Sequence, residues 1–244
     1  MSHGTLAVVP TPIGNLEDIT LRALRVLRDC DAVVAEDSRR TRSLLTAHGI
    51  SRPVISLPAH AERARVPALL SRLDAGESLA LCTDAGTPAV SDPGSVLVRA
   101  ARAAGYSVTS LPGASAVTTA VAGSGVGGGG GFCFLGFPPR TPGKLRRTLA
   151  GALATGLPVV FFEASPRLAR TLRLLVDLVG EREVVVGREL SKLHESYYAG
   201  TAAELSAAFL ATPPRGECTV VVAPGVAVPL PAAAQAADPG LVGW

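Results

Sequence analysis

Five carboxylates in this sequence stand at the ends of short apolar runs, and they are its first candidates for chemistry. They are Glu36, Asp37, Asp84, Glu163 and Glu189. If each run is a strand, its carboxylate lies at the carboxyl end, where open α/β sheets bind ligands. A carboxylate there can accept the proton of a substrate hydroxyl. It can also simply cap the helix that follows, but five on one edge favour a site.

Three short loops rich in glycine and proline accompany these carboxylates. They are residues 10–14 (PTPIG), 84–88 (DAGTP) and 112–115 (PGAS). Small residues let backbone amides and carbonyls approach a ligand closely. Because no lysine accompanies the loops, they suit a neutral or mildly charged nucleoside better than a triphosphate.

The fingerprints of several common chemistries are absent from the sequence. The pattern G-x-G-x-x-G occurs only inside the glycine-rich run 123–131, which does not follow a strand and open a helix as the dinucleotide fingerprint does, and there is no P-loop motif. Dinucleotide and nucleoside triphosphate binding therefore lack their signatures. The sequence has no H-E-x-x-H, no G-x-S-x-G and no clustered histidines, so zinc-dependent and triad hydrolysis are unsupported. The four cysteines show no C-x-x-C spacing and lie in or beside apolar runs, which predicts buried reduced thiols and no metal site.

The elements that must position these residues alternate between β-branched runs and helical stretches, which is typical of an α/β protein. One expected helix runs from Thr20, and another begins with Asp92 as its N-cap and Pro93 at the first helical position. The glycine-rich segment 123–131 divides the pattern into two halves. We therefore expect an α/β domain over 1–122, a linker over 123–131, a second α/β domain over 132–225 and a disordered tail over 226–244.

The charge of the chain is nearly balanced but unevenly distributed. The net charge is +3, yet seven arginines stand against one acid between residues 38 and 73, and residues 140–147 carry four cations and no acid. A basic face of this kind suits a polyanion such as RNA, although a solubilising helix surface would look the same. Aromatic residues make up only 4% of the chain, which argues against base stacking on an aromatic platform.

The N-terminal residues show no basic start followed by a long apolar stretch, so we predict no signal peptide. No apolar run approaches the roughly 20 residues that a membrane helix needs. We therefore expect a cytoplasmic protein.

Six motifs, taken together and in order, resemble the ribosomal RNA small-subunit methyltransferase I family. They are VPTPIGNLEDITLRAL, AEDSRRT, DAGTPAVSDPG, LPGASA, FFEASPRL and GRELSKLHES, and the match runs from about residue 6 to about residue 224. This family belongs to the tetrapyrrole-methylase (class III) superfamily and methylates a cytidine ribose 2′-oxygen of 16S RNA with S-adenosylmethionine. The resemblance implies two α/β domains with the cofactor in a cleft between them, usually in a homodimer.

The resemblance also implies which residues hold the cofactor. Three loops of the first domain and three positions of the second match the family's binding residues. They are Pro12, Ile13 and Gly14 in the first loop, Asp84, Ala85, Gly86, Thr87 and Val90 in the second, Ser115 and Ala116 in the third, and Phe162, Gly187 and Gly216 in the second domain.

Methyl transfer to a ribose hydroxyl needs an in-line approach of the oxygen to the sulfonium methyl and a group that takes the proton. Our candidates for the proton acceptor are Asp37 and Glu189. Lys192 is expected to stabilise the developing oxyanion, and Arg39 to hold a phosphate beside the target. Each of the four could instead form a simple surface or capping pair.

The two basic segments supply the residues expected to bind phosphates of 16S RNA or of the small ribosomal subunit. They are Arg40, Arg42, Arg63, Arg65, Arg140, Lys144, Arg146 and Arg147. Such contacts carry little sequence information. The choice of base would come from RNA shape and from extrusion of the target nucleotide.

Two other functions stay open at this point. A class III methyltransferase could act on a tetrapyrrole or on a modified protein side chain, but those relatives usually carry a G-x-G-x-G first loop and a GDP second loop. This chain has PTPIG and GTP instead. The other possibility is a non-catalytic RNA-binding module that has kept the fold.

Overall fold

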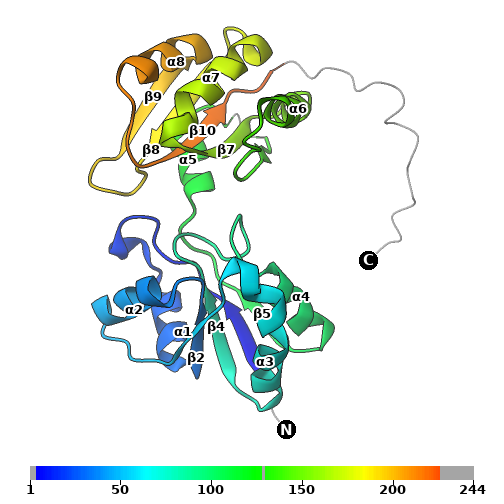
Figure 1. The fold of residues 1–244 in the computed structure, drawn as a ribbon. Helices are drawn as coiled ribbons and strands as arrows, with labels where there is room; N and C mark the ends of the chain where they lie inside the picture. The colour runs from blue at the N-terminus through cyan, green and yellow to red at the C-terminus, as the bar shows by residue number, and fades with distance from the viewer. Residues whose placement is uncertain (1–3, 128–129, 226–244) are drawn as a thin grey trace, which may run out of the picture. The chain divides into compact units, whose positions relative to one another are not determined.

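Both halves of the chain are α/β, as the alternation of runs predicts. The computed structural model describes residues 4–127 and 130–225, and the expected tail over 226–244 lies outside them. By its contacts the chain divides into two compact units (Figure 1). Each unit carries one five-stranded sheet with its own helices, and each is described by itself.

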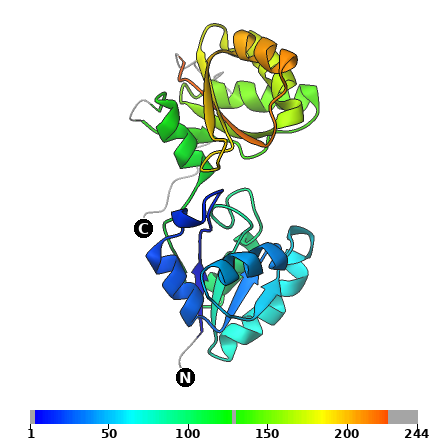
Figure 2. The same cartoon turned by 90° about the vertical axis from the view of Figure 1, so that its left-hand side faces the viewer.

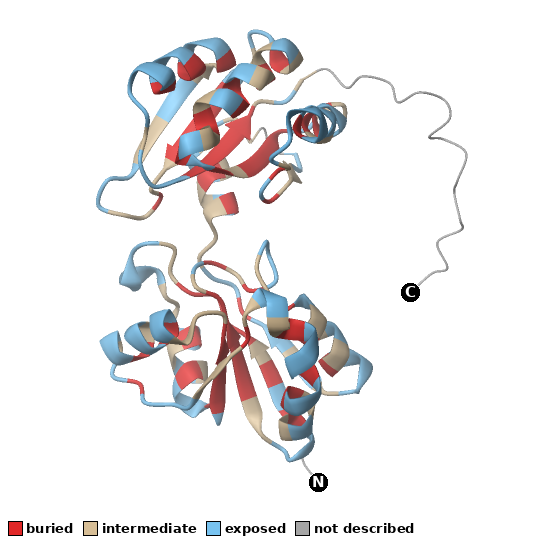
Figure 3. Cartoon of the chain, viewed as in Figure 1, coloured by how far each residue is buried: buried red, intermediate tan, exposed pale blue. Residues whose placement is uncertain are grey.

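The first unit is built on a sheet of short parallel strands. They are β1 (Thr5–Val8), β2 (Ala32–Ala35), β3 (Val54–Ser56), β4 (Ser78–Cys82) and β5 (Ser107–Ser110), in the order β3-β2-β4-β1-β5. β2 is buried along its whole length (Figure 3), because helices cover both faces of the sheet. Since the five strands run in one direction, their carboxyl ends share one edge.

Four helices cover the two faces of this sheet (Figure 2). They are α1 (Leu21–Asp29), α2 (Ser38–Ala47), α3 (Glu62–Asp74) and α4 (Ser95–Ala103), with two 3-10 turns, η1 (Leu16–Asp18) and η2 (Ala59–Ala61). Leu27 of α1 and Leu45 of α2 belong to one hydrophobic core. Leu69 of α3 and Leu97 of α4 belong to another. Alternate strand residues enter the two cores, as the pleat requires.

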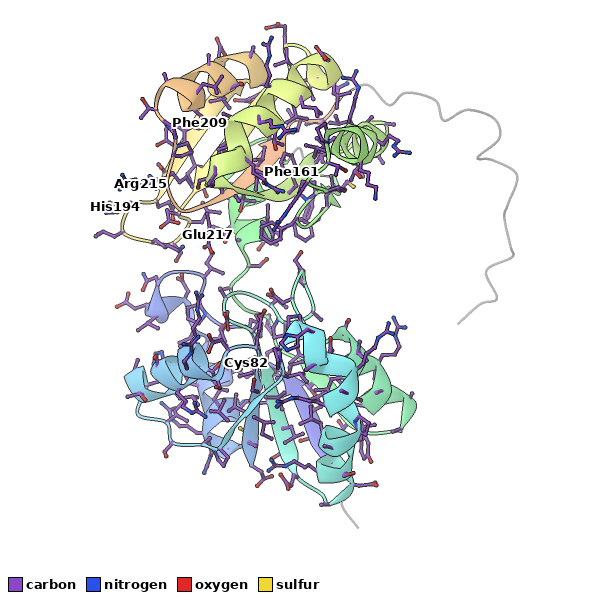
Figure 4. All side chains as sticks on the ribbon, viewed as in Figure 1. Cys82, Phe161, His194, Phe209, Arg215 and Glu217 are labelled. Atoms are coloured by element: carbon purple, nitrogen blue, oxygen red, sulfur yellow. The ribbon has the colours of Figure 1, made fainter. Side chains whose placement is uncertain are left out.

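The second unit carries a mixed sheet. Its strands are β6 (Cys133–Phe134), β7 (Val159–Ala164), β8 (Glu183–Arg188), β9 (Ser196–Thr201) and β10 (Glu217–Val222), in the order β6-β7-β10-β8-β9. β6 and β7 are parallel, whereas β10 is antiparallel to β7 and β8, and β9 is antiparallel to β8. Its helices are α6 (Pro142–Leu153), α7 (Ser165–Val179) and α8 (Ala202–Ala211), and α5 (Ala116–Ser124) belongs partly to each unit. Phe161 of β7 and Phe209 of α8 lie in one core with residues of α6 and α7 (Figure 4).

The boundary between the units differs from the one we expected. It falls between Thr119 and Ala120, inside α5, whereas we placed the end of the first domain at residue 122. The glycine-rich segment was also expected to be irregular from Gly123 onward, but α5 continues to Ser124. The hydroxyl of Tyr197 occupies the space that a Cβ at residue 123 would need, so this position of the helix requires glycine.

Candidate functional site

The first two expected cofactor loops lie side by side at the carboxyl ends of β1 and β4. Thr11 and Gly86 exchange two backbone hydrogen bonds, each 2.9 Å from nitrogen to oxygen. The buried hydroxyl of Thr11 donates to the carbonyl of Thr83 at 3.0 Å. Cys82 ends β4 directly before the second loop (Figure 4). These contacts bring residues 12–14 next to residues 84–87.

The third expected loop, which follows β5, adjoins the second. The hydroxyl of Thr87 donates to the carbonyl of Ala114 at 3.4 Å. Gly113 packs so closely on Pro10 that a Cβ at residue 113 would come within 2.6 Å of the Pro10 Cβ. Glycine is therefore required there. Residues 115–116 follow directly, so all three loops meet at one edge of the first sheet.

Asp84 links the second loop to the start of α2. Its Oδ1 accepts the backbone N–H of Asp37 at 3.0 Å, and its Oδ2 lies 3.5 Å from Nε of Arg40. Arg40, which we expected to contact RNA, is therefore also an ion-pair partner within the site. Because the Arg40 side chain is 68% exposed, the pair stabilises the fold by no more than about 1 kcal/mol.

Asp37 caps α2 and pairs with Arg39. Its Oδ1 accepts the backbone N–H of Arg39 at 2.8 Å, and the Arg39 guanidinium donates to both carboxylate oxygens at 3.3 and 3.1 Å. These bonds from Arg39 hold the pKa of Asp37 below its usual range. The lowered pKa makes the Asp37 carboxylate a weak proton acceptor in this arrangement, and the Arg39 side chain that holds it is 87% exposed.

Asp92, which we expected only as a helix cap, joins the carboxylates of this edge instead. The N-cap of α4 is Gly94, so that expectation is wrong. Asp92 is half-buried beside Thr83, whose hydroxyl donates to Oε2 of Glu36 at 2.8 Å. Burial raises the pKa of Asp92 to about 6; a hydrogen bond with Thr83 opposes the rise, and the charges of Glu36 and Asp84 add to it.

Glu62 fills the capping role that we assigned to Asp92. Its Oε1 accepts the backbone N–H groups of Gly94, Val96 and Leu97 at 2.9, 2.9 and 3.2 Å. These groups belong to the first turn of α4, which has no acceptor of its own for them. Glu62 is buried and reaches them from the start of α3. No local pattern signals this contact, because its partners are at least 32 residues apart.

The second half of the second loop has an unusual backbone. Ala89 and Ser91 have φ angles of 68° and 66°, in the region that favours glycine. The N–H groups of Ala89 and Val90 donate to the carbonyls of Pro93 and Thr87, each at 3.2 Å. Val90, the last residue expected in this loop, is 41% exposed. Strain of this kind persists only where the surroundings enforce it, and it is common at ligand sites.

The segment Leu190–Leu193 belongs by its contacts to the first unit, although it follows β8. Gly14 makes room for it, since a Cβ at residue 14 would overlap the side chain of Lys192. The hydroxyl of Ser191 donates to the carboxylate of Asp18, and Ser191 has a φ of 65°. Two expected site residues, Gly14 and Lys192, are thus in contact.

The remaining expected residues lie in the second unit. Oε1 of Glu189 accepts the N–H of Glu217 at 2.8 Å, at the start of β10 (Figure 4). Its carboxylate also fills the space beside Gly216, where the φ of 90° and the absence of a side chain both require glycine. Gly187 lies within β8, between β10 and β9. Phe162 lies in β7, where its ring packs against other aromatic rings.

Glu163, the fifth carboxylate of the initial set, serves the packing of α7. It is 2% exposed, and its oxygens accept bonds from Nε of Arg167 at 2.7 Å and from the hydroxyl of Thr171 at 2.6 Å. A carboxylate saturated in this way is a structural element rather than a ligand-binding group.

All eight residues expected to bind RNA are exposed. Arg40 and Arg42 lie on α2, Arg63 and Arg65 lie on the first turns of α3, and Arg140, Lys144, Arg146 and Arg147 lie before or on α6. Because α2 and α3 cover opposite faces of the first sheet, the basic stretch 38–73 is not one continuous face. Both helices begin at the carboxyl edge, however, so their first turns flank the loops described above.

The cysteines and acids give no sign of a metal centre. In the described ranges 4–127 and 130–225, no group of three or more His, Cys, Asp and Glu residues could hold a metal ion. Cys30, Cys82 and Cys218 are buried, and burial raises the pKa of each thiol. Cys133 is only partly buried, which differs from our expectation for all four. No helix in the same described part of the chain is long and apolar enough to cross a membrane.

Sequence comparisons link this chain to proteins that modify ribosomal RNA. The family model described as Tetrapyrrole (Corrin/Porphyrin) Methylases matches residues 5–206. A protein of Thermotoga maritima, named Ribosomal RNA small subunit methyltransferase I, is 44% identical over 220 residues, which cover 90% of this chain and 98% of that protein. A protein of the same name from Neisseria meningitidis serogroup A is 43% identical over 223 residues, 91% of this chain and 76% of its own.

Solved structures of lower sequence identity share the fold. The cobalamin biosynthetic enzyme cobalt precorrin-4 methyltransferase matches with a TM-score of 0.68 at 16% identity, covering 90% of this chain and 94% of its own. Uroporphyrin III C-methyltransferase from Thermus thermophilus matches with a TM-score of 0.63 at 17% identity, covering 89% and 97%.

Proposed function

Because the chain belongs to the tetrapyrrole methylase family, and within it to the ribosomal RNA small subunit methyltransferase I group, we propose that it transfers a methyl group from S-adenosylmethionine to the 2′-oxygen of a cytidine ribose in 16S ribosomal RNA. The observation that carries this proposal is the meeting of three backbone loops at one edge of the first sheet, where Thr11 and Gly86 tie two of them together. An RNA substrate of this kind would be met in the cytoplasm.

The three loops suit a nucleoside that carries a positive sulfonium. They offer backbone groups and small side chains, and the neighbouring acids Glu36, Asp84 and Asp92 favour a cation over a triphosphate. We assign the cofactor to residues 12–14, 84–87, 90 and 115–116 of the first unit. Phe162, Gly187 and Gly216, which the resemblance to the family adds, stay predictions. When bound, S-adenosylmethionine supplies an already activated methyl group, so positioning of the hydroxyl provides much of the acceleration.

The proton of the ribose hydroxyl must leave as the new bond forms, and Asp37 and Glu189 are the proposed acceptors. Lys192, which lies against Gly14 of the first loop, is proposed to stabilise the developing oxyanion. Arg39 links this chemistry to RNA binding. If a phosphate draws the Arg39 guanidinium away, the pKa of Asp37 rises and the carboxylate becomes a better base.

A homodimer is also part of the proposal, and the first unit has a surface that suits it. The edge strand β5 is largely exposed, and a groove of about 340 Å³ runs between it and α1. Arg22, Asp29 and Thr109 are among the residues that line the groove. Because the groove holds both charge signs, Arg22 of one copy could pair with Asp29 of a second copy across a two-fold axis. Light scattering at micromolar concentration should give twice the mass of one chain, and a monomer mass would contradict the dimer.

Mass spectrometry of ribosomal RNA tests the proposed activity. A strain that lacks this gene should lose one 2′-O-methylcytidine from 16S RNA, and the purified protein with S-adenosylmethionine should restore it on small subunits or on naked RNA from that strain. An unchanged 2′-O-methylcytidine signal would overturn the function. If a tetrapyrrole is methylated instead, the substrate assignment is wrong. If titration calorimetry detects no cofactor binding, the protein is an RNA-binding module.

A further inference from the structure

An exposed aromatic ring stands out on the second unit. Phe137 is 63% exposed, whereas no other aromatic side chain in the described residues exceeds 37%. It lies in the loop between β6 and α6, five residues before the start of that helix. Single exposed hydrophobic side chains are ordinary on protein surfaces, so the significance of this ring depends on the residues around it.

The ring is held firmly from one side. Its centroid is 5.2 Å from that of Phe162, and the Phe162 centroid is 5.0 Å from that of Phe134. The carbonyl of Gly136 accepts the N–H of Phe162 at 2.8 Å, and Gly136 and Pro138, on either side of Phe137, are buried. The backbone around Phe137 is therefore fixed, and one face of an aromatic cluster remains open to a ligand.

Positive charge without compensating acids surrounds this ring in the sequence. Between Asp92 and Glu163 the chain contains no acid, and Arg140 and Lys144 follow Phe137 within seven residues. Both cations are exposed, and neither forms an ion pair within residues 4–127 or 130–225. An exposed aromatic ring followed within seven residues by two unpaired cations suits single-stranded nucleic acid, because bases stack on such a ring and phosphates pair with the charges.

We propose that Phe137 stacks on a base of the RNA substrate, while Arg140 and Lys144 bind the phosphates that flank this base. The inference rests on the proposed function and adds to it a residue that selects single-stranded RNA. S-adenosylmethionine also carries a base, but it has no phosphate, so the cations beside the ring match RNA and not the cofactor. The low aromatic content of the chain argued against base stacking on an aromatic platform. Three of the six phenylalanines nevertheless gather in this one cluster.

The test compares Phe137→Ala and Phe137→Trp with the matched control Leu210→Ala, which removes a side chain that is 67% exposed on α8 of the same unit. Fluorescence anisotropy measures binding to a single-stranded oligoribonucleotide from 16S RNA, and calorimetry measures binding of S-adenosylmethionine. Loss of one stacking contact should weaken RNA binding by about 5- to 150-fold in the alanine variant. The tryptophan and control variants should bind RNA like the wild type, and all three should bind the cofactor normally.

An oligonucleotide with abasic sites separates stacking from charge. On this probe Phe137→Ala should have no effect, because no base remains to stack, whereas Arg140→Ala should still weaken binding. If Phe137→Ala weakens cofactor binding and spares RNA, the ring holds the adenine of the cofactor and the inference is wrong. It is also wrong if the wild type methylates RNA while Phe137→Ala binds it unchanged. If the wild type neither binds the cofactor nor methylates RNA, the proposed function itself fails.

Discussion

Single buried polar side chains fix the backbone of the first unit near the candidate site. Oε1 of Glu62 alone satisfies three backbone N–H groups of α4, and the hydroxyl of Thr11 ties the first loop to the end of β4. The resemblance to a family predicted the loop residues, but it did not show which side chains hold the loops. Glu62 was missed because its partners lie at least 32 residues away in the sequence, where no spacing rule applies.

Glu62→Ala should lower the free energy of unfolding by about 2–3 kcal/mol, because it leaves buried N–H groups without an acceptor. Glu62→Gln keeps an amide oxygen in the same place, so its loss should be about 1 kcal/mol or less. Urea denaturation followed by circular dichroism gives both values. Glu181→Ala, an exposed change at the end of α7, is the matched control, and an alanine variant at 62 that is as stable as this control would contradict the capping role.

Asp92 should make stability depend on pH in a distinctive window. Its pKa in the folded protein is about 6, against an ordinary value of 3.8. As the pH rises from about 4 to 6, the unfolded chain loses this proton before the folded chain does, so the group's contribution to stability is lost across that interval. Asp92→Asn cannot ionise. The free energy of unfolding of this variant, measured in urea from pH 4 to pH 8, should therefore fall less than that of the wild type. If the free energies of the two proteins change equally with pH, the raised pKa of Asp92 is wrong.

At the scale of elements, alternation of apolar runs predicted most strands and helices correctly. The helix expected from Thr20 is α1, which begins one residue later with Thr20 as its N-cap, and the capping box of Thr201 and Glu204 opens α8. Strand β9 was missed because its sequence SYYAGT alternates poorly and directly precedes that cap. The pattern of apolar residues could not predict strand direction either. The buried valine run of β10, which is antiparallel to both neighbours, looks like that of a parallel strand. Periodicity reports burial, not pairing.

The packing of residues 190–193 on the first loop gives a prediction for Gly14. Gly14→Ala places a Cβ where the Lys192 side chain now lies, so the lysine must move. We expect kcat/KM for RNA methylation to fall roughly 10- to 100-fold. The matched control is Gly151→Ala on α6, where a Cβ meets nothing within 4 Å. That change should leave turnover intact and raise the free energy of unfolding by about 0.5–1 kcal/mol. If the two variants turn over equally fast, the position of Lys192 does not matter for catalysis.

At the scale of the whole molecule, the distribution of charge matters more than its sum. The chain has a net charge of +3, but its acids are absent from residues 93–162, which include all of α6. The sequence alone shows this basic segment. It could not show that α2 and α3 place their arginines on opposite faces of a sheet, because a linear count ignores which way each helix packs.

The salt dependence of RNA binding should report the contribution of α6. Each phosphate contact to a single strand adds about 0.7 to the slope of log affinity against log salt. Replacing Lys144 and Arg147 by glutamine should therefore reduce the slope by about 1.4 for single-stranded 16S fragments. Arg173→Gln, an exposed change on α7, serves as the control. If the slope does not change, Lys144 and Arg147 of α6 do not contact RNA phosphates.

The attachment of residues 190–193 to the first unit constrains how such a gene can recombine. A single crossover near Thr119, where the contacts divide the chain, would join one parent's first loop to the other parent's Lys192. Leu190, only 6% exposed, would then pack against a foreign surface. Chimeras between relatives should fold and turn over best when this tetrapeptide is exchanged together with the N-terminal half, so that inheritance of the site requires three crossovers instead of one.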